Sequence, residues 1–502
     1  MSSRPLAALA ALAALLVLGA APARAAGAAE VGMEDERLLL GDQAEAARVV
    51  DDWKDLGVRM VRLHAHWWTI APARDAMRPP RRFDQSDPKD PHYNWWPLDN
   101  AIALVRAAGM RVMLTVTGPG PLWTSREPWR HNPVWKPDAR AFGRFARAVA
   151  RRYRGQIDSY LIWNEPNFPS WLMPQWTCVR RYVCAPAAPH IYRGLVRAAA
   201  PAIRAADPGA KVIAGELAPI GLPPRTASTR MAPLTFLRAM ACVDAFYRPL
   251  RSGPCGHFRP ATPDGLGYHP HPVLNPPDRR NPDRNSAQMG DLGRLFAVLD
   301  RLSLRGRLGR GRLPVYLTEF GYQTSPPDHA IGITLAQQTR YLQQAAFIAW
   351  QRRRVRVLTF YQWEDEPVHW RGPGTRAYAG WQSGLRFVNG RPKPVFTTFA
   401  APFVIAQQPG RRSALLWGQV RPAALHTVTI LVRPRGARSF RPLATATTDA
   451  QGYWTRTMVV SRRAAYRFLW TPLKGRPQLS GVVDLARPEP TALRAAAALA
   501  RR

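Results

Sequence analysis

The chain has 502 residues, of which 46% are hydrophobic and 18 are Trp. This length exceeds one ordinary domain, and the apolar content supplies a large core, which excludes an intrinsically disordered protein. The 36 Gly and 49 Pro separate periodic segments and do not form tracts, which indicates many turns. We therefore expect a folded domain of roughly 250 to 400 residues with a small second module.

The formal net charge of +37 raises the question of a nucleic-acid partner. Of the 71 basic residues only six are Lys, so Arg accounts for the other 65. They are spread along the whole chain, whereas dedicated nucleic-acid domains concentrate charge in a patch or tail. We expect no nucleic-acid partner. A basic surface protein that adsorbs to acidic polymers is an alternative.

The N-terminus is typical of a secretory signal peptide over residues 1–25. Arg4 gives a basic start, residues 6–20 form an apolar run, and residues 23–25 match the small-x-small cleavage pattern. The sequence thus predicts a secreted protein, extracellular or associated with the cell wall. The alternative is that this segment is retained as a membrane anchor. No other stretch of the sequence is long and apolar enough to span a bilayer.

Four Cys in an exported protein indicate two disulfides. Of the three possible connectivities, Cys178 with Cys184 and Cys242 with Cys255 is favoured, because each bond then closes one loop. No CxxC motif occurs, and the His residues lack the spacing of metal ligands. The sequence therefore predicts no metal site, and no cofactor is expected.

From residue 31 onward, strand-like and helix-like segments alternate. Strands are expected at 31–33, 59–63, 111–116, 161–165, 211–214, 265–269, 315–319 and 355–363. Helices are expected at 42–56, 98–108, 137–153, 191–206, 234–242, 292–303 and 335–350. Repeats of this kind predict an α/β fold, a (β/α)8 TIM barrel over 30–395. An open doubly wound sheet is the competitor, but the sequence lacks its Gly-rich phosphate turn.

From about residue 396 the pattern changes to short alternating runs separated by turn residues. Five strands are expected there, at 414–417, 427–432, 443–447, 453–459 and 466–470. They predict a small β-sandwich over 400–486, followed by a tail at 487–502. The sandwich resembles the immunoglobulin-like or fibronectin-like modules of secreted bacterial enzymes. It either binds carbohydrate through exposed Trp or Tyr, or supports the barrel by packing.

Two short segments carry the candidate chemistry. Residues 161–167 read Leu-Ile-Trp-Asn-Glu-Pro-Asn, and residues 315–321 read Val-Tyr-Leu-Thr-Glu-Phe-Gly. Each is an apolar run that ends in a carboxylate, Glu165 or Glu319, with a turn-forming Pro or Gly close behind. Buried parallel strands deliver side chains to the rim of a barrel in this way. Two carboxylates that face one sugar are the minimum requirement for glycoside hydrolysis.

With these motifs, residues 30–400 resemble the retaining glycoside hydrolases of clan A, near the β-xylosidase and α-L-iduronidase family or cellulase-like relatives. The resemblance implies that Glu165 is the general acid/base and Glu319 the nucleophile. It also implies that Asn164 binds the sugar 2-hydroxyl and that Arg62 pairs with the nucleophile. The structural alternatives are a turn cap for Asn164 and an ordinary surface position for Arg62.

The same resemblance implies roles for further residues. His269 and His271 lie at the end of the sixth strand, where the clan places a His and a Tyr or second His near the nucleophile. Trp363 matches the Trp of the eighth strand that forms a sugar platform, since aromatic faces suit the apolar face of a pyranose. Trp123 and Trp68 either extend that platform or pack in the core.

The sequence therefore predicts a secreted, monomeric retaining glycosidase that needs no cofactor and whose partner is a carbohydrate substrate. A non-catalytic carbohydrate-binding barrel of the cell surface is the alternative from another functional class. The sugar, the linkage and endo or exo action stay open, because they depend on loop residues that the fold class does not fix.

Overall fold

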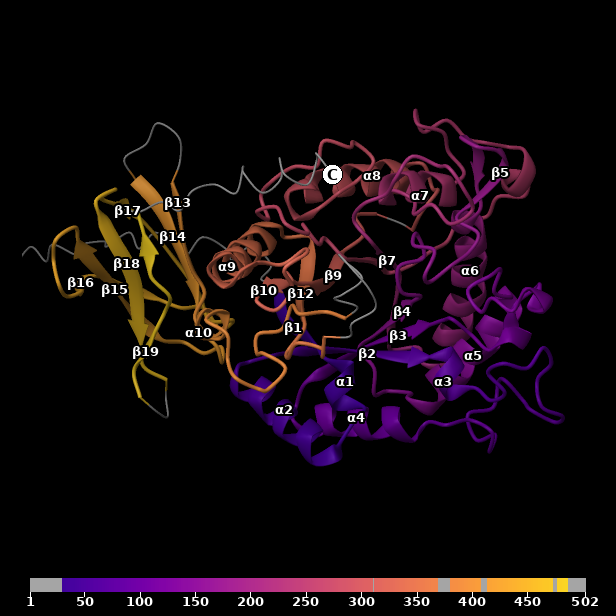
Figure 1. Ribbon diagram of the computed structural model, residues 1–502, viewed down its shortest axis with the longest axis horizontal. Helices are drawn as coiled ribbons and strands as arrows, with labels where there is room; N and C mark the ends of the chain where they lie inside the picture. The colour runs from indigo at the N-terminus through magenta and orange to yellow at the C-terminus, as the bar shows by residue number, and fades with distance from the viewer. Residues whose placement is uncertain (1–28, 310, 369–379, 408–412, 473–475, 486–502) are drawn as a thin grey trace, which may run out of the picture.

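The computed structural model describes residues 29–309, 311–368, 380–407, 413–472 and 476–485. Eight parallel strands form a closed barrel in the order β1-β12-β9-β8-β7-β4-β3-β2 (Figure 1). These strands are β1 (Glu30–Glu34), β2 (Met60–His66), β3 (Arg111–Thr117), β4 (Ser159–Ile162), β7 (Lys211–Leu217), β8 (Gly265–Tyr268), β9 (Val315–Phe320) and β12 (Val355–Tyr361). The predicted TIM barrel is confirmed.

A helix follows every barrel strand: α2 (Gln43–Asp55), α4 (Trp96–Ala107), α5 (Ala139–Arg152), α6 (Ala188–Ala206), α7 (Pro233–Met240), α8 (Leu292–Leu304), α9 (Leu335–Gln351) and α10 (Val395–Ala400). Local sequence sets where they begin. Asp138 caps α5 by accepting a hydrogen bond of 2.8 Å from the backbone N of Ala141. Thr334 and Gln337 form a capping box at the start of α9. Two single-turn helices, α1 (Glu36–Leu39) and α3 (Trp67–Ile70), follow β1 and β2 directly.

The predicted strands and helices are present, with boundaries that differ by a few residues. The clearest difference concerns β4, which ends at Ile162. Glu165 therefore lies in the loop after the strand, with a left-handed backbone (φ 36°). The sequence did not predict helix α10, the antiparallel hairpin of β5 (Trp176–Arg180) and β6 (Val183–Pro186), or the short pair β10 (Thr324–Ser325) and β11 (Ile333–Thr334).

The barrel interior is apolar at one level and polar at the next. Six strands contribute an apolar cluster formed by Met60, Met113, Leu161, Ile213, Tyr316 and Val357. Side chains on one face of a strand recur every two residues. The next position on this face is therefore Arg62 in β2 and Thr115 in β3, and both are buried. The polar layer thus lies toward the carboxyl ends of the strands, the rim where barrel enzymes have their sites.

Two antiparallel sheets follow the barrel. One contains β13 (Phe403–Gln407), β14 (Ser413–Gln419) and β17 (Tyr453–Val459); the other contains β15 (Thr427–Pro434), β16 (Arg441–Thr447), β18 (Ala464–Trp470), β19 (Gln478–Leu479) and β20 (Val483–Asp484). They enclose a core of their own, in which Trp454 stacks on Phe403 and meets Phe468 edge to face. The predicted sandwich and its five strands are confirmed. The sequence missed β13, β19 and β20.

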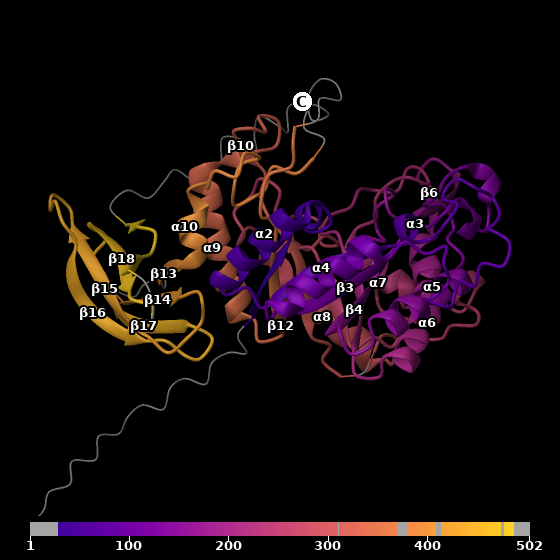
Figure 2. The same ribbon diagram turned by 90° about the horizontal axis from the view of Figure 1, so that it is seen from below.

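The sandwich lies beside helices α9 and α10, as both views show (Figures 1 and 2). Trp417 of β14 is fully buried there against Phe347 and Trp350 of α9, with ring centroids 5.5 and 6.0 Å away. Tyr453 donates a hydrogen bond of 2.8 Å to the carbonyl of Ala29, just before β1. All Trp and Tyr side chains in the described part of the sandwich are buried. This favours a supporting role over a carbohydrate-binding surface.

The two predicted disulfides are present. Cys178–Cys184 joins the strands of the β5–β6 hairpin, and Cys242–Cys255 joins the end of α7 to the 3-10 turn η3 (Gly253–Cys255). Within the described residues, every helix is too short or too polar to cross a lipid bilayer. The predicted signal peptide (1–25) and tail (487–502) lie outside the described residues.

Replacement of Trp417 by Ala tests the contact between sandwich and barrel. A buried Trp→Ala change removes many contacts and costs about 3–5 kcal/mol. We expect the urea concentration at the first unfolding midpoint to fall clearly for Trp417→Ala. The matched control Trp129→Ala, whose side chain is exposed, should keep the wild-type midpoint. Equal midpoints in the two variants would contradict this interface.

Candidate active site

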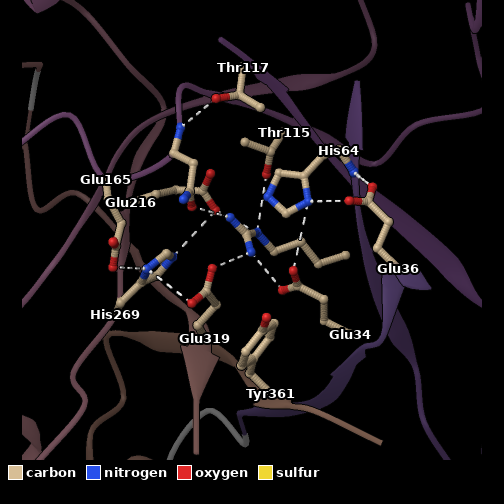
Figure 3. A network of polar contacts seen from close by, with 12 residues as sticks. Glu34, Glu36, His64, Thr115, Thr117, Glu165, Glu216, His269, Glu319 and Tyr361 are labelled. Carbon is tan, nitrogen blue, oxygen red and sulfur yellow. Dashed lines mark hydrogen bonds and ion pairs between the residues drawn. The ribbon is translucent and has the colours of Figure 1, made fainter. Parts of the chain in front are cut away.

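The guanidinium of Arg62, on strand β2, lies at the centre of a buried polar network. Its Nη1 donates hydrogen bonds to Glu34 Oε2 at 2.6 Å and to Glu319 Oε1 at 2.7 Å. Its Nη2 donates to Asn164 Oδ1 at 2.8 Å, and its Nε lies 2.8 Å from Glu216 Oε1. Figure 3 shows Glu34, Glu216 and Glu319 turned toward one centre. The Nε of Arg62 also donates to Thr115 Oγ1 at 3.1 Å, so one cation contacts side chains from five other barrel strands or the loops that follow them.

His269 directly follows strand β8 and is fully buried. Its Nδ1 lies 3.0 Å from Glu165 Oε1 and 3.4 Å from Glu319 Oε2 (Figure 3). These two contacts limit the separation of the two carboxylate oxygens to about 6.4 Å. The side chains of Glu165 and Glu319 are partly exposed. The two predicted carboxylates therefore meet at one imidazole, within reach of solvent.

The surroundings favour the ionised form of Glu319. Burial disfavours it, but the positive charges of His269 and Arg62 outweigh burial and hold the pKa of Glu319 well below its usual range. His271 adds to this effect, with its Nε2 3.4 Å from Glu319 Oε2. In contrast, burial raises the pKa of Glu34 well above its usual value, although Arg62 lowers it. Arg62 is thus shared by an ionised Glu319 and a Glu34 that holds its proton more strongly.

The imidazole of His269 is held in its charged form. Burial lowers its pKa, but Glu319, Glu165 and Glu216 together raise the pKa of His269 to about 10. Burial would raise the pKa of Glu216, but the charges of Arg62 and His269 lower it to about 2. Two cations, Arg62 and His269, therefore face two ionised carboxylates, Glu216 and Glu319.

Glu216 is a central member of the network that the sequence analysis missed. It is fully buried on strand β7, and its backbone carbonyl accepts a hydrogen bond of 3.1 Å from the backbone N of Glu165. Gly267 on the neighbouring strand makes room for it, since a Cβ there would lie 2.7 Å from Glu216 Cγ. The available signal was a charged residue inside an apolar strand. Glu34, at the end of the first strand, gave a similar signal.

Four of the predicted binding residues lie in this network: Arg62, Asn164, His269 and His271. Trp363 does not. Its ring is only 2% exposed and packs against Trp53 and Phe396 in the barrel core. The expectation that Trp363 offers a platform to a sugar is therefore wrong, because strand β12 ends at Tyr361 and the chain beyond it carries this ring into the core.

A different Trp lies beside the network. Trp381 is 40% exposed and stacks on His271, with ring centroids 5.8 Å apart. It also meets Tyr361, at the end of β12, edge to face. The sequence gave little indication of it, since it lies in a loop with no strand pattern around it. Trp381 is therefore an exposed aromatic ring in contact with His271 and Tyr361, which Trp363 is not.

The two remaining predicted aromatic residues have partners of their own. Trp123 is partly buried, meets Trp67 edge to face, and donates a hydrogen bond of 3.0 Å to the carbonyl of Pro72. The guanidinium of Arg74 covers the ring of Trp68, 3.8 Å from its centroid. Both rings belong to the packing after β2 and β3, and their contact with a sugar stays a prediction.

Among the described residues, four groups of side chains lie close enough to hold a metal ion: His190, Cys242 and Cys255; Glu36, His64 and His66; His269, His271 and Glu319; Glu34, His64 and Glu319. The first contains the two Cys of a disulfide and is not available. The last two share Glu319, whose carboxylate Arg62 already binds. Of the second group, Glu36 and His64 lie at the edge of the network in Figure 3.

Solved structures share this fold. A glucosidase from Croceicoccus marinus matches 91% of this chain and 97% of its own chain, with 12% identity and a TM-score of 0.50. A family 39 glycoside hydrolase from Bacteroides cellulosilyticus WH2 matches 89% of this chain and 81% of its own, with 14% identity and a TM-score of 0.46. An endo-β-1,4-mannanase from Thermotoga petrophila has 12% identity, coverages of 91% and 97%, and a TM-score of 0.41.

No family model matches the sequence, and no curated protein matches it significantly. At 12% identity the likeness to the glucosidase concerns the fold. The resemblance to glycoside hydrolases with a TIM barrel, which the two Glu motifs predicted, is thus confirmed at the level of architecture.

The pKa of His269 predicts how stability depends on pH. A group whose pKa is raised in the folded state stabilises it fully below the unfolded pKa, and this stabilisation is lost as pH rises through the folded pKa. For His269 this window runs from about 6.5 to about 10. We expect the wild-type melting temperature to fall more steeply across this window than that of His269→Gln. Parallel curves for the two proteins would contradict a buried imidazolium.

Proposed function

We propose that this protein is a retaining glycoside hydrolase, with Glu319 as nucleophile and Glu165 as general acid/base. The observation that carries the proposal is the shared contact of both carboxylates with His269 Nδ1, which limits their separation to about 6.4 Å. Retaining enzymes hold these groups about 5–5.5 Å apart, and inverting enzymes about 6.5–9.5 Å apart. The proposal is further supported by the barrel fold that the chain shares with a glucosidase.

In the first step, the Glu319 carboxylate attacks the anomeric carbon while Glu165 gives its proton to the leaving oxygen. Arg62 and His269 hold Glu319 ionised and orient it for attack. The result is a covalent glycosyl-enzyme. In the second step, Glu165 takes a proton from water, and the water oxygen attacks the anomeric carbon and displaces Glu319.

Asn164 and Trp381 are the groups we propose for sugar recognition. The Oδ1 of Asn164 accepts a hydrogen bond from Arg62, which leaves its amide NH₂ to donate to a sugar hydroxyl beside Glu319. Trp381 offers an exposed ring next to His271, and aromatic faces suit the apolar face of a pyranose. The substrate class is thus an O-glycoside of an oligo- or polysaccharide.

Glu216 is proposed as a positioning residue. Its carboxylate balances the charges of Arg62 and His269, and its backbone carbonyl holds the loop at Glu165. It has no exposed atoms, so it acts on the reaction through these neighbours and not through contact with the sugar.

We also propose that the protein works outside the cytoplasm. Two disulfides close loops in the described residues, and disulfides persist in oxidising compartments. The signal-like pattern of residues 1–25 agrees with export. Secretion and the high positive charge are compatible with an enzyme that acts on polysaccharides near anionic cell walls.

Two substitutions test the proposed roles. Glu319→Ala should abolish turnover of every aryl glycoside that the wild type hydrolyses. Glu165→Gln should slow glycosides with poor leaving groups about 10²–10⁴-fold. It should spare the first step for dinitrophenyl glycosides, because their leaving group needs no proton. The measurement is kcat/KM across a series of leaving groups, with Glu45→Gln of helix α2 as the matched control.

The anomeric configuration of the first product, observed by NMR, completes this test. Retention is expected, and inversion would contradict the assignment of Glu319. A correctly folded wild type that binds sugars but hydrolyses none of a broad panel would favour the non-catalytic carbohydrate-binding barrel.

Glu216→Gln tests the positioning role, because it removes one buried negative charge and keeps the shape of the side chain. Loss of an anion lowers the pKa of every neighbouring group that holds a proton. The alkaline limb of the pH profile of kcat/KM should therefore move to lower pH. Glu127→Gln, whose carboxylate pairs with Arg130 and Lys136 and not with Arg62 or His269, should leave the profile unchanged. A uniform loss of activity with no shift of the profile would reduce Glu216 to a packing role.

A further inference from the structure

The strand that carries Arg62 also carries two imidazoles toward its carboxyl end. Side chains at alternate positions share one face of a strand, so His64 and His66 follow Arg62 on the same side. Glu36, in the first turn of helix α1, lies against both of them. Its Oε2 lies 2.9 Å from His66 Nε2 and 3.2 Å from His64 Nδ1. Three potential ligand atoms from two segments of the chain thus converge.

The carboxylate of Glu36 is fixed in this position. Its Oε1 accepts a hydrogen bond of 2.7 Å from the backbone N of His64. This bond leaves Oε2 to face the two imidazoles. The rings of His64 and His66 stack on each other, with centroids 4.9 Å apart. The cluster is therefore held in place before any ligand arrives.

Within this cluster, the imidazole of His64 lacks a hydrogen-bond partner. Its side chain is only 7% exposed, and neither of its ring nitrogens has a hydrogen-bond partner among the described residues. A buried imidazole without a hydrogen bond carries a desolvation cost. The close nitrogen, Nδ1, is the one that lies 3.2 Å from Glu36 Oε2 without hydrogen-bond geometry. Glu36 Oε2 already has a hydrogen-bond contact with His66 Nε2 at 2.9 Å, whereas a ligand beside it would give His64 Nδ1 the partner that it lacks.

We propose that Glu36, His64 and His66 form a binding site for a divalent transition-metal ion such as Zn²⁺. Two imidazole nitrogens and one carboxylate are a ligand set that zinc uses, whereas Mg²⁺ and Ca²⁺ prefer oxygen ligands alone. With zinc–ligand distances of about 2.0–2.1 Å, tetrahedral ligand atoms lie about 3.3 Å apart. The observed contacts of 2.9 and 3.2 Å are near this value.

The place of the cluster in the fold agrees with ion binding. Glu36 and His66 are about one-fifth exposed, so an ion can enter from solvent and keep one coordination position for water. Arg62 is two residues away on the same strand, but the ionised carboxylates of Glu216 and Glu319 already contact its guanidinium. The metal site does not depend on the proposed glycosidase activity.

The sequence analysis expected no metal site, because the His residues lack the usual spacing of ligands. The spacing from His64 to His66 is that of a strand, where alternate residues share a face, and the third ligand comes from a separate turn of helix. Only the fold brings Glu36 to them.

The test uses tag-free, full-length protein stripped of metal with a chelator. Titration with Zn²⁺ in a calorimeter should show one ion per chain, and Co²⁺ should give the visible absorption of a tetrahedral site. Glu36→Gln and His66→Ala should each weaken binding at least about tenfold. His92→Ala is the matched control, because His92 also contacts a carboxylate, Asp90, at 2.8 Å, but on the surface. It should bind as the wild type does.

Each outcome decides the proposal. The proposal would be overturned if the wild type bound no zinc at about 100 µM. It would also be overturned if the Glu36→Gln/His66→Ala double variant bound zinc as tightly as the wild type. In either case Glu36, His64 and His66 would be in side-chain contact only. If the variants fail to fold, X-ray absorption on the zinc-loaded wild type replaces them. Two imidazole ligands and oxygen ligands at about 2.0–2.1 Å would support the site, and any other coordination would overturn it.

Discussion

The buried guanidinium of Arg62 is the constraint on which the rest of the site depends. Transfer of an ion from water into a protein interior costs several kcal/mol unless partners compensate it. Arg62 has such partners in Glu34, Glu216 and Glu319, which come from three other strands of the barrel. A closed barrel is one of the few folds that can direct side chains from strands so far apart in sequence to a single point. The barrel fold therefore brings the charged side chains together, and their contacts offset the free-energy cost of burying Arg62.

The same network explains why the pKa values of two carboxylates that contact one cation shift in opposite directions. Arg62 Nη1 contacts Glu34 and Glu319 at nearly equal distance. Only Glu319 also lies next to two imidazoles, His269 and His271. Glu319 is therefore stabilised as an anion, whereas for Glu34 burial dominates and raises the pKa well above its usual value. This difference supports the proposal that Glu319 is the nucleophile, and His269 Nδ1 contacts Glu165 as well as Glu319.

The features that sequence predicted are those that a local pattern determines. The alternation of strands and helices predicted the barrel. An acid at the end of an apolar run indicated Glu165 and Glu319 as the candidate catalytic carboxylates. The sequence signal for Glu216 was only a charged residue inside an apolar strand, because its burial depends on the neighbouring Gly267 and its ion pair on Arg62 across the barrel. The burial of Trp363 was not predicted for a similar reason. Whether a Trp beyond a strand faces the site or the core depends on the path of a loop, which no periodicity determines.

The most direct test of the account is mass spectrometry of the protein inactivated by a 2-deoxy-2-fluoroglycoside. Such a reagent forms the covalent intermediate but slows its hydrolysis, so the sugar stays attached to the nucleophile. The account predicts a peptide that carries the sugar on Glu319. A label on Glu34, which shares the same nitrogen of Arg62, or on Glu165 would contradict it.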